Sequence, residues 1–328
     1  MRDLDRRQML FATVAASALN LVSAGRSLAA DLPKVGIVHP GPKGPIPSIS
    51  AVVAGMAALG YEDGKTVAIE YRYAEGKLDQ LPSILRNLVE QDTKVIVAVA
   101  GEALVAAAQV TKSVPIVSAT AGGDFVSMGL IKSWDRPDTN VTGMNLIADQ
   151  AAAARVEILK KVLPAARTLV VLVNPYPGND ELLTAMRAVS LKANIKLETV
   201  DISKVDELEA AIVNAKRNGA DAVTSLQGPF FFFQRKLLAD LSLKYRIPLA
   251  MSEALSGEAG ALLQVNPDVP GCAERSAGFV DLILKGATPS GLKIERYSRY
   301  DVVFNLRTAR ELGIKISPDT IKGSKVIE

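Results

Sequence analysis

The sequence predicts an α/β protein built as two doubly wound lobes, each a parallel sheet with helices on both faces. Its 328 residues exceed what one hydrophobic core usually supports, so two domains are expected. Short runs rich in β-branched residues alternate with longer runs of helical periodicity, which is the pattern of βαβ units. The alternation restarts after Gly143, and a second lobe is therefore expected there.

The predicted elements divide between the lobes in chain order. In the first lobe, strands are expected at residues 34–38, 67–73, 95–99 and 115–119, and helices at 49–59, 78–90 and 104–111. In the second lobe, strands are expected at residues 168–173, 196–201, 222–226, 249–251 and 261–265, and helices at 151–163, 180–192, 205–218 and 232–245.

The chain is expected to cross between the lobes more than once. The first crossing is predicted near residues 140–143, an extended segment that follows a turn-forming stretch. A helix at 272–285 and a strand with a helix at 301–312 are too few for a third domain, so they are expected to return to the lobes and to complete a multi-strand hinge. The predicted domains are lobe 1, residues 30–142 and about 266–298, and lobe 2, residues 143–265 and about 299–328.

Residues 1–29 are predicted to be an export signal peptide, cleaved near Ala29 and Ala30. Arginines give it a positive start, residues 9–22 are mostly apolar, and small residues precede the cleavage site. The pair Arg6 and Arg7 favours the twin-arginine route, and the general secretory route also fits. No run approaches the roughly 20 apolar residues that span a bilayer, so a periplasmic protein without direct membrane insertion is expected.

Charge and composition exclude several classes of function. The formal net charge is +3 without any basic block, so no nucleic-acid partner is expected. Cys272 is the one cysteine and lies in a helical packing pattern, which excludes an internal disulfide and a cysteine-rich metal cluster. His39 is the one histidine and limits zinc sites and Ser-His-Asp arrangements to itself. We predict no catalytic residue, metal or cofactor.

A glycine-containing segment at residues 60–66 resembles a phosphate-binding loop. It has three residues between its glycines where that loop has four, and it follows a predicted helix rather than a strand. Nucleotide binding is therefore not expected, and Gly60 is interpreted as the end of the helix.

The candidate binding residues lie where the predicted strands end. Open parallel sheets bind ligands beyond the carboxyl ends of their strands, where loop amides and helix N-termini point. Two such sheets facing each other across a hinge would form a cleft that closes over a small molecule. Four consecutive Phe residues cannot all face one cleft, so only the first of them is included. The candidate ligand-binding residues are His39, Pro40, Gly101, Glu102, Ala119, Thr120, Ala121, Asn174, Tyr176, Asn179, Gln227, Phe230, Ser252, Glu253 and Gln264.

Several segments resemble one known family in the order expected. They are residues 69–76 (IEYRYAEG), 109–117 (QVTKSVPIV), 140–143 (NVTG) after Arg136-Pro137, 279–286 (FVDLILKG) and 303–313 (VFNLRTARELG). The chain is similar in these segments to ABC-transporter substrate-binding proteins related to bacterial tryptophan- and tyrosine-binding components. The resemblance implies the type I periplasmic binding fold, a non-enzymatic role, and delivery of a ligand to a membrane permease. A monomer is expected.

The resemblance also implies a ligand class. Similar members bind small carboxylates, such as aromatic or hydrophobic amino acids or aromatic acids, with loop amides and hydroxyls. Here Gly101-Glu102 stands where the family usually has Gly, a Ser or Thr, and Pro, and Phe125 stands where Pro is common. A sugar or other polar solute therefore stays open as the ligand. A sensory ligand-binding module stays open as the function, and a hydrolase that uses Glu253 and Glu258 as an acid/base pair is less favoured.

Overall fold

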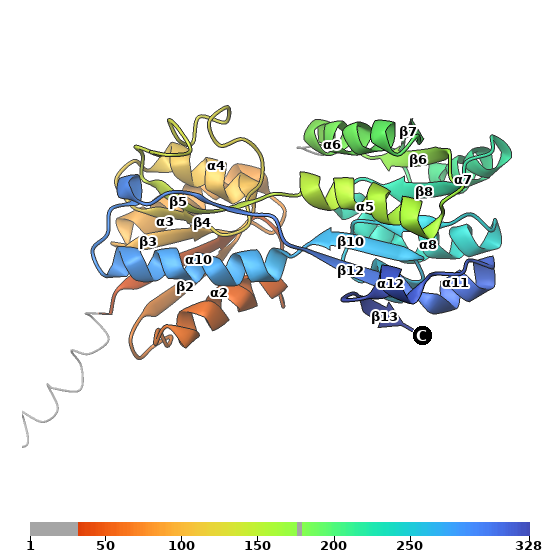
Figure 1. Ribbon diagram of the computed structural model, residues 1–328. Helices are drawn as coiled ribbons and strands as arrows, with labels where there is room; N and C mark the ends of the chain where they lie inside the picture. Colours follow the sequence, from red (N-terminus) through yellow and green to blue (C-terminus); the bar gives the residue numbers. More distant parts are fainter. Residues whose placement is uncertain (1–31, 176–178) are drawn as a thin grey trace, which may run out of the picture. The chain divides into compact units, whose positions relative to one another are not determined.

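The computed structural model describes residues 32–175 and 179–328, and within them the chain forms two compact units (Figure 1). Unit 1 comprises residues 32–121, 126–144 and 273–294, and unit 2 comprises residues 122–125, 145–272 and 295–328. The chain thus passes between the units at residues 144–145, 272–273 and 294–295, besides the short segment 122–125. The predicted signal peptide and its cleavage site lie outside the described residues.

The first sheet has six strands in the order β11-β5-β4-β3-β1-β2. β1 pairs in parallel with β2 along its whole length and with β3 on its other side, so His39 ends its strand at the carboxyl edge of the sheet. The strands are β1 (Lys34–His39), β2 (Ala68–Tyr73), β3 (Val95–Ala98), β4 (Ile116–Ser118), β5 (Val141–Leu146) and β11 (Glu295–Tyr297).

Helices cover both faces of this sheet because its buried side chains alternate. Val35 and Ile37 pack on one face with residues of α2 and α10. Gly36 points to the opposite face, where a Cβ would lie 2.8 Å from Leu88 Cδ1 of α3, so glycine lets that helix pack closely. The helices are α2 (Pro47–Ala58), α3 (Leu81–Glu90), preceded by a 3-10 turn (Leu78–Gln80), α4 (Gly101–Val110) and α10 (Val269–Leu284). A second 3-10 turn (Pro289–Gly291) precedes β11.

The second sheet has seven strands in the order β13-β12-β10-β9-β8-β6-β7. Its described pairs are parallel except β10 with β12, which is antiparallel. The strands are β6 (Thr168–Val173), β7 (Lys196–Asp201), β8 (Ala222–Ser225), β9 (Leu249–Met251), β10 (Leu263–Pro267), β12 (Tyr300–Asn305) and β13 (Lys325–Ile327). The helices are α5 (Asp149–Val162), α6 (Asn179–Lys192), α7 (Glu207–Arg217), α8 (Pro229–Lys244), α9 (Ser256–Ala259), α11 (Leu306–Leu312) and α12 (Pro318–Ile321).

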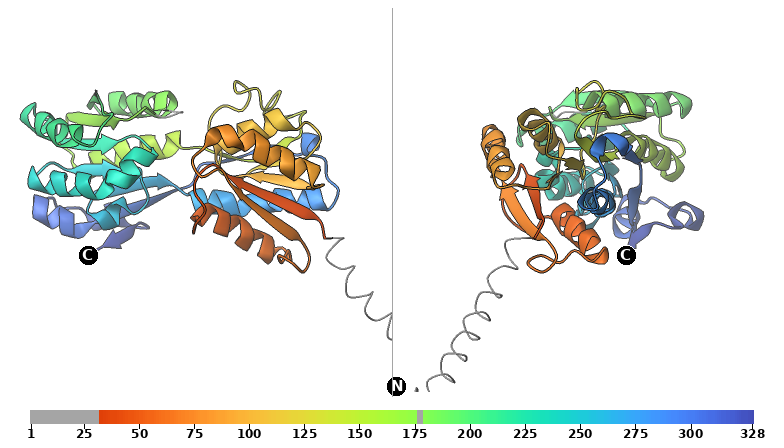
Figure 2. Two further views of the ribbon diagram at one scale, coloured as in Figure 1. Left: turned by 180° about the vertical axis from the view of Figure 1, so that it is seen from behind. Right: turned by 90° about the vertical axis from the view of Figure 1, so that its left-hand side faces the viewer.

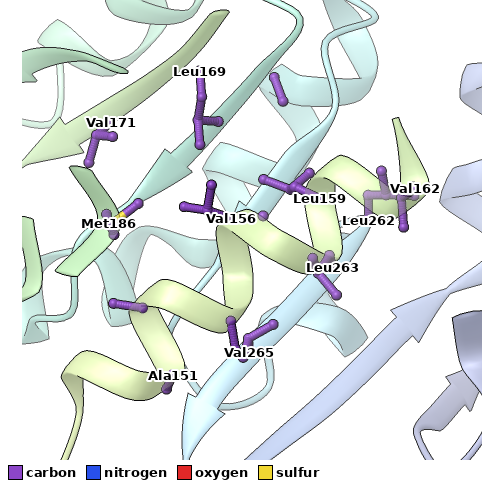
Figure 3. Packing of buried hydrophobic residues seen from close by; sticks show 14 of the residues in the cluster. Ala151, Val156, Leu159, Val162, Leu169, Val171, Met186, Leu262, Leu263 and Val265 are labelled. Carbon is purple, nitrogen blue, oxygen red and sulfur yellow. The ribbon is translucent and has the colours of Figure 1, made fainter. Parts of the chain in front are cut away.

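The core of unit 2 lies on both faces of this sheet, as a doubly wound lobe requires. Leu169 and Val171 of β6 belong to one cluster, with side chains of α5 and α6 (Figure 3). Val170 and Leu172, which alternate with them, belong to a second cluster with α7 and α8. The further views in Figure 2 show helices on both faces of each sheet, and the predicted α/β class with parallel sheets is confirmed.

Several predicted boundaries are wrong by a few residues at helix starts. α4 begins at Gly101, α8 at Pro229 and α10 at Val269, each three residues before the expected start. First turns expose their polar face and carry little periodicity, and Pro at the first position of α8 is a start signal that outweighs it. The segment expected as a linker at 140–143 lies largely in β5, and α9, β11, α12 and β13 were not predicted because each is only three or four residues long. No helix in the described ranges is long and apolar enough to cross a membrane.

Candidate functional site

Unit 2 carries a pocket at the carboxyl ends of three neighbouring strands. β8, β9 and β10 lie side by side in the sheet, and the residues that follow or end them converge with the first turns of α8 and α10. The pocket has a volume of about 250 Å³. It is lined by Gln227, Gly228, Phe232, Ser252, Glu253, Ala254, Asn266, Pro267 and Val269.

Glu253 is the one ionisable side chain in this lining, and it is almost fully buried, with 5% of its surface exposed. Its Oε2 accepts hydrogen bonds from Ser225 Oγ at 2.9 Å and from the Ser252 amide at 3.2 Å. Its Oε1 accepts one from Ser252 Oγ at 2.9 Å. The pKa of the carboxyl is raised above its ordinary value, because burial outweighs the opposing effects of the Arg155 charge and of these donors.

Arg155 lies beneath this site, in the core of unit 2. It projects from α5 and only 1% of its surface is exposed. Its Nη2 donates to the carbonyl of Ser225 at 2.9 Å, and its Nη1 lies 3.5 Å from the carbonyl of Val265. Burial lowers its pKa to about 10, so the guanidinium keeps its charge at neutral pH, and the charge of Glu253 favours that state. The guanidinium thus bonds the end of β8, lies close to β10, and offsets the charge of a buried carboxylate.

A second chain of buried amides supports the other side of the pocket. Gln264 Oε1 accepts from the Gly257 amide at 2.9 Å, and Gln264 Nε2 donates to Asn266 Oδ1 at 2.6 Å. Asn266 Nδ2 donates to the carbonyl of Pro267 at 3.1 Å. Gln264, predicted as a binding residue, therefore fixes Asn266, which lines the pocket in its place.

In unit 1, the strand-end residues gather around the start of α4. Ala100 has φ 84° and ψ 159°, a backbone conformation that is favourable only for glycine, and its amide donates to Thr120 Oγ1 at 3.0 Å. No side chain caps α4 at Ala100, so the amides of its first turn, at Gly101 and Glu102, are not used by a capping side chain. Backbone strain is thus held at the point where a helix N-terminus opens.

His39 lies close to this helix start. Its Nδ1 accepts a hydrogen bond from the Gly41 amide at 2.9 Å, which requires an unprotonated Nδ1. Burial lowers the pKa of the imidazole below its ordinary 6.5, and the charge of nearby Glu102 partly offsets this. A neutral imidazole is therefore present at neutral pH.

The structure brings together only some of the predicted binding residues. Gln227, Ser252 and Glu253 line the unit 2 pocket, and the aromatic side chain there is Phe232. Phe230 packs against a buried cluster of unit 2, with its ring 5.2 Å from that of Phe231. Successive side chains of a helix point in different directions, which a run of four identical residues conceals.

Other predicted residues have structural partners or are buried. Asn174 Nδ2 donates to the Ile202 carbonyl and Asn179 Nδ2 to the Asn174 carbonyl, both at 2.8 Å, so they fix the loop after β6. Ala119 and Ala121 are buried, so they can offer a ligand only their backbone. Pro40 is half-buried beside His39, and Tyr176 lies outside the described residues.

The pocket residues that the sequence did not single out are Gly228, Phe232, Ala254, Asn266, Pro267 and Val269. Phe232 stands at the start of a predicted helix, and the other five lie in predicted loops close to the strand ends. The strand-end rule selects the edge of the sheet where this pocket lies, and it does not select the individual side chains. In the described part of the chain no group of His, Cys, Asp and Glu could hold a metal ion.

A concave pocket with a few placed polar groups, at the carboxyl edge of a doubly wound sheet, defines a small-molecule-binding protein. The chain belongs to the ABC transporter substrate binding protein family, whose model matches residues 43–325. The family resemblance predicted from the sequence is thereby confirmed, and the family consists of substrate-binding proteins rather than enzymes.

Relatives support the same assignment. The chain is similar to the tyrosine-binding protein of Clostridioides difficile (strain R20291), with 24% identity over 274 residues, 82% of this chain and 78% of that protein. Among solved structures, a conserved domain protein from Vibrio cholerae O1 biovar El Tor matches with a TM-score of 0.76 and 24% identity, over 91% of this chain and 100% of that one. The ABC domain from Streptococcus pneumoniae in complex with L-Trp matches with a TM-score of 0.75 and 22% identity, over 91% and 100%. The type I periplasmic binding fold is thereby confirmed.

Proposed function

We propose that this protein is the periplasmic solute receptor of an ABC importer and that its ligand is a small carboxylate with an aromatic or hydrophobic group. The observation that carries the proposal is the start of α4, which presents first-turn amides without a capping side chain at the carboxyl edge of the first sheet. Such a helix N-terminus favours an anion, since both its amides and its dipole point there.

The unit 2 pocket supports the aromatic part of the proposal. Phe232 contributes an aromatic side chain to the lining, and Ala254, Pro267 and Val269 add apolar surface. An aromatic pair contributes about 0.5–1.5 kcal/mol beyond the burial of area. The named ligands of two relatives, tyrosine and L-Trp, are of the same chemical class. That both sets of residues serve one ligand, in a cleft between lobes, stays a prediction from the sequence.

The first experiment is a ligand search with the purified protein. Native mass spectrometry of the protein as purified detects a retained ligand, and a thermal-shift screen of amino acids, aromatic acids and sugars follows. A ligand at 100 times its Kd adds about 2.7 kcal/mol to the free energy of unfolding. A shift with carboxylates supports the proposal, whereas shifts with sugars alone would show that the ligand is a polar solute instead. Compaction at saturating ligand, measured by small-angle X-ray scattering, tests the predicted closure.

Two neighbouring phenylalanines give a matched pair of variants. Phe232 lines the pocket, whereas Phe233 is 73% exposed on the same helix. Phe232→Ala should weaken binding of an aromatic ligand by about tenfold or more, since ring contact and buried area are both lost. Phe233→Ala should bind like the unaltered protein. Equal affinities of the two variants would place the aromatic group elsewhere.

A further inference from the structure

We infer that the unit 2 pocket is a receptor for a protonated amine, with the Glu253 carboxylate as its acceptor. The inference rests on the proposed function and narrows it, because an α-amino acid then binds in preference to an acid of the same shape without the amino group. It assigns Glu253 as the residue that determines this specificity and Arg155 as the residue that positions it.

Hydrogen bonds from two serines hold the Glu253 carboxylate in place. Ser225 and Ser252 together donate three hydrogen bonds to it, two to Oε2 and one to Oε1. A carboxylate has about four lone-pair sites, so Oε1 keeps one for a further donor. Glu253 lines the pocket, and the two serines and Arg155 bond it or act on it from the surrounding wall and core. The spare acceptor position belongs to a group fixed by its neighbours, as a selective binding site requires.

The two buried charged groups, Arg155 and Glu253, have different roles. The Arg155 guanidinium donates to the carbonyl at the end of β8, lies 3.5 Å from the Val265 carbonyl in the middle of β10, and takes no part in lining the pocket. Of these two residues, only Glu253 lines the pocket. Two buried charges that influence each other and served stability alone would gain nothing from placing the acid in the wall of a cavity, because apolar replacements of such charges are often as stable.

The described wall of the unit 2 pocket carries an acidic but no basic side chain. The nine residues that line it include no lysine or arginine. Arg235, on the same helix as Phe232, lies over the Phe232 ring at 4.3 Å and donates to the Phe232 carbonyl, so it is already engaged. A ligand cation therefore meets one acidic acceptor, Glu253, and no cationic residue among those that line the pocket, which suits an ammonium group.

A second glutamate close in sequence, Glu258, has a different environment. It lies on α9, five residues further along the chain, and its Oε1 accepts from Lys325 Nζ at 2.5 Å. The acid/base pair of a hydrolase would need Glu253 and Glu258 to share a reacting group. Glu258 is instead paired at the surface with β13, which makes it a suitable control.

The test compares ligands that differ only in the amino or the carboxyl group. Isothermal titration calorimetry at pH 7.5 measures L-tyrosine, 3-(4-hydroxyphenyl)propionate and tyramine, and the same series built on L-tryptophan. A charge-assisted hydrogen bond in a desolvated site predicts that the unaltered protein binds the amino acid about 10- to 100-fold more tightly than its deaminated analogue. Glu253→Gln should reduce this ratio to about threefold or less by weakening only the amino acid, while Glu258→Gln keeps the ratio.

Each outcome decides between the two proposals. Equal affinity of the unaltered protein for the amino acid and the deaminated acid overturns the amine receptor and leaves the carboxylate function intact. Binding of tyramine without binding of the deaminated acid overturns the carboxylate function and keeps the amine receptor. An unchanged ratio in folded Glu253→Gln, judged by circular dichroism, also overturns the inference. If this variant does not fold, the comparison of ligands on the unaltered protein decides alone.

Discussion

Arg155 and Glu253 should behave as one unit when unit 2 is destabilised by mutation. Arg155→Met keeps much of the apolar volume of the side chain and removes its charge and its hydrogen bond to the Ser225 carbonyl. Both groups are buried, so the carboxylate is left without its balancing charge. Breaking a buried pair on one side costs about 3–5 kcal/mol, which is a large part of the 5–15 kcal/mol that usually separates folded from unfolded states.

The measurement is urea denaturation at pH 7.5 followed by circular dichroism. With an m-value of about 3 kcal/mol/M, a loss of 3–5 kcal/mol lowers the midpoint by about 1–1.7 M. Glu253→Gln alone should also lower it, because the guanidinium is then unbalanced. The double variant Arg155→Met/Glu253→Gln should be more stable than Arg155→Met alone, since neither charge remains. Strict additivity of the two single losses, within about 0.5 kcal/mol, would refute the coupling.

Three further outcomes follow from the described geometry. His39 gives the one histidine signal in the NMR spectrum, and its pKa should be found below 6.5. The unfolded chain then takes up the proton more readily, so the free energy of unfolding should fall as the pH drops through 6.5 and level off below the folded pKa. His39→Asn should remove that dependence on pH. Gly271→Ala should cost about 1–3 kcal/mol of stability, because its Cβ would collide with the hydrogen-bonded side chains of Asp268 and Tyr297. In Gly278→Ala, on the same helix, the Cβ meets no atom within 4 Å, so this variant should be neutral or stabilised by up to about 1 kcal/mol. Equal effects of the two variants in thermal denaturation would contradict this account. Ala100→Gly should raise the melting temperature even though glycine usually lowers it, because the φ of 84° is relieved, and a lower melting temperature would show that the backbone is not strained there.

The order of strands and helices could be predicted because each follows from a local pattern. The run at β6 is almost entirely apolar, and β6 and β8 are buried on both faces, so the parallel sheet and its two helical layers follow directly. The short edge strand β13 could not be foreseen, because its pairing with β12 depends on a neighbour distant in sequence rather than on its own three residues. Helix starts were missed for a related reason, since a first turn is defined by its hydrogen bonds and not by periodicity.

The candidate site divides in a similar way. Glu253 could be singled out because it follows a predicted strand, and the structure places it in a pocket. Arg155 lies in the middle of α5, where a charged side chain is usually expected to face solvent, and only the packing of α5 over β8 and β10 reveals that it is buried. The sequence favours Phe230 over Phe232 as a binding residue, because the direction in which a helical side chain points depends on where the helix begins.

Cys272 has a practical consequence. It is the one cysteine of the chain, and its side chain is fully buried in α10. A maleimide dye added to the folded protein should therefore find no native thiol to modify at the surface. A cysteine introduced in place of exposed Phe233, next to the pocket residue Phe232, would carry the dye at a single known position. The natural sequence is thus already suited to a fluorescent sensor that reports its own ligand, without prior removal of cysteines.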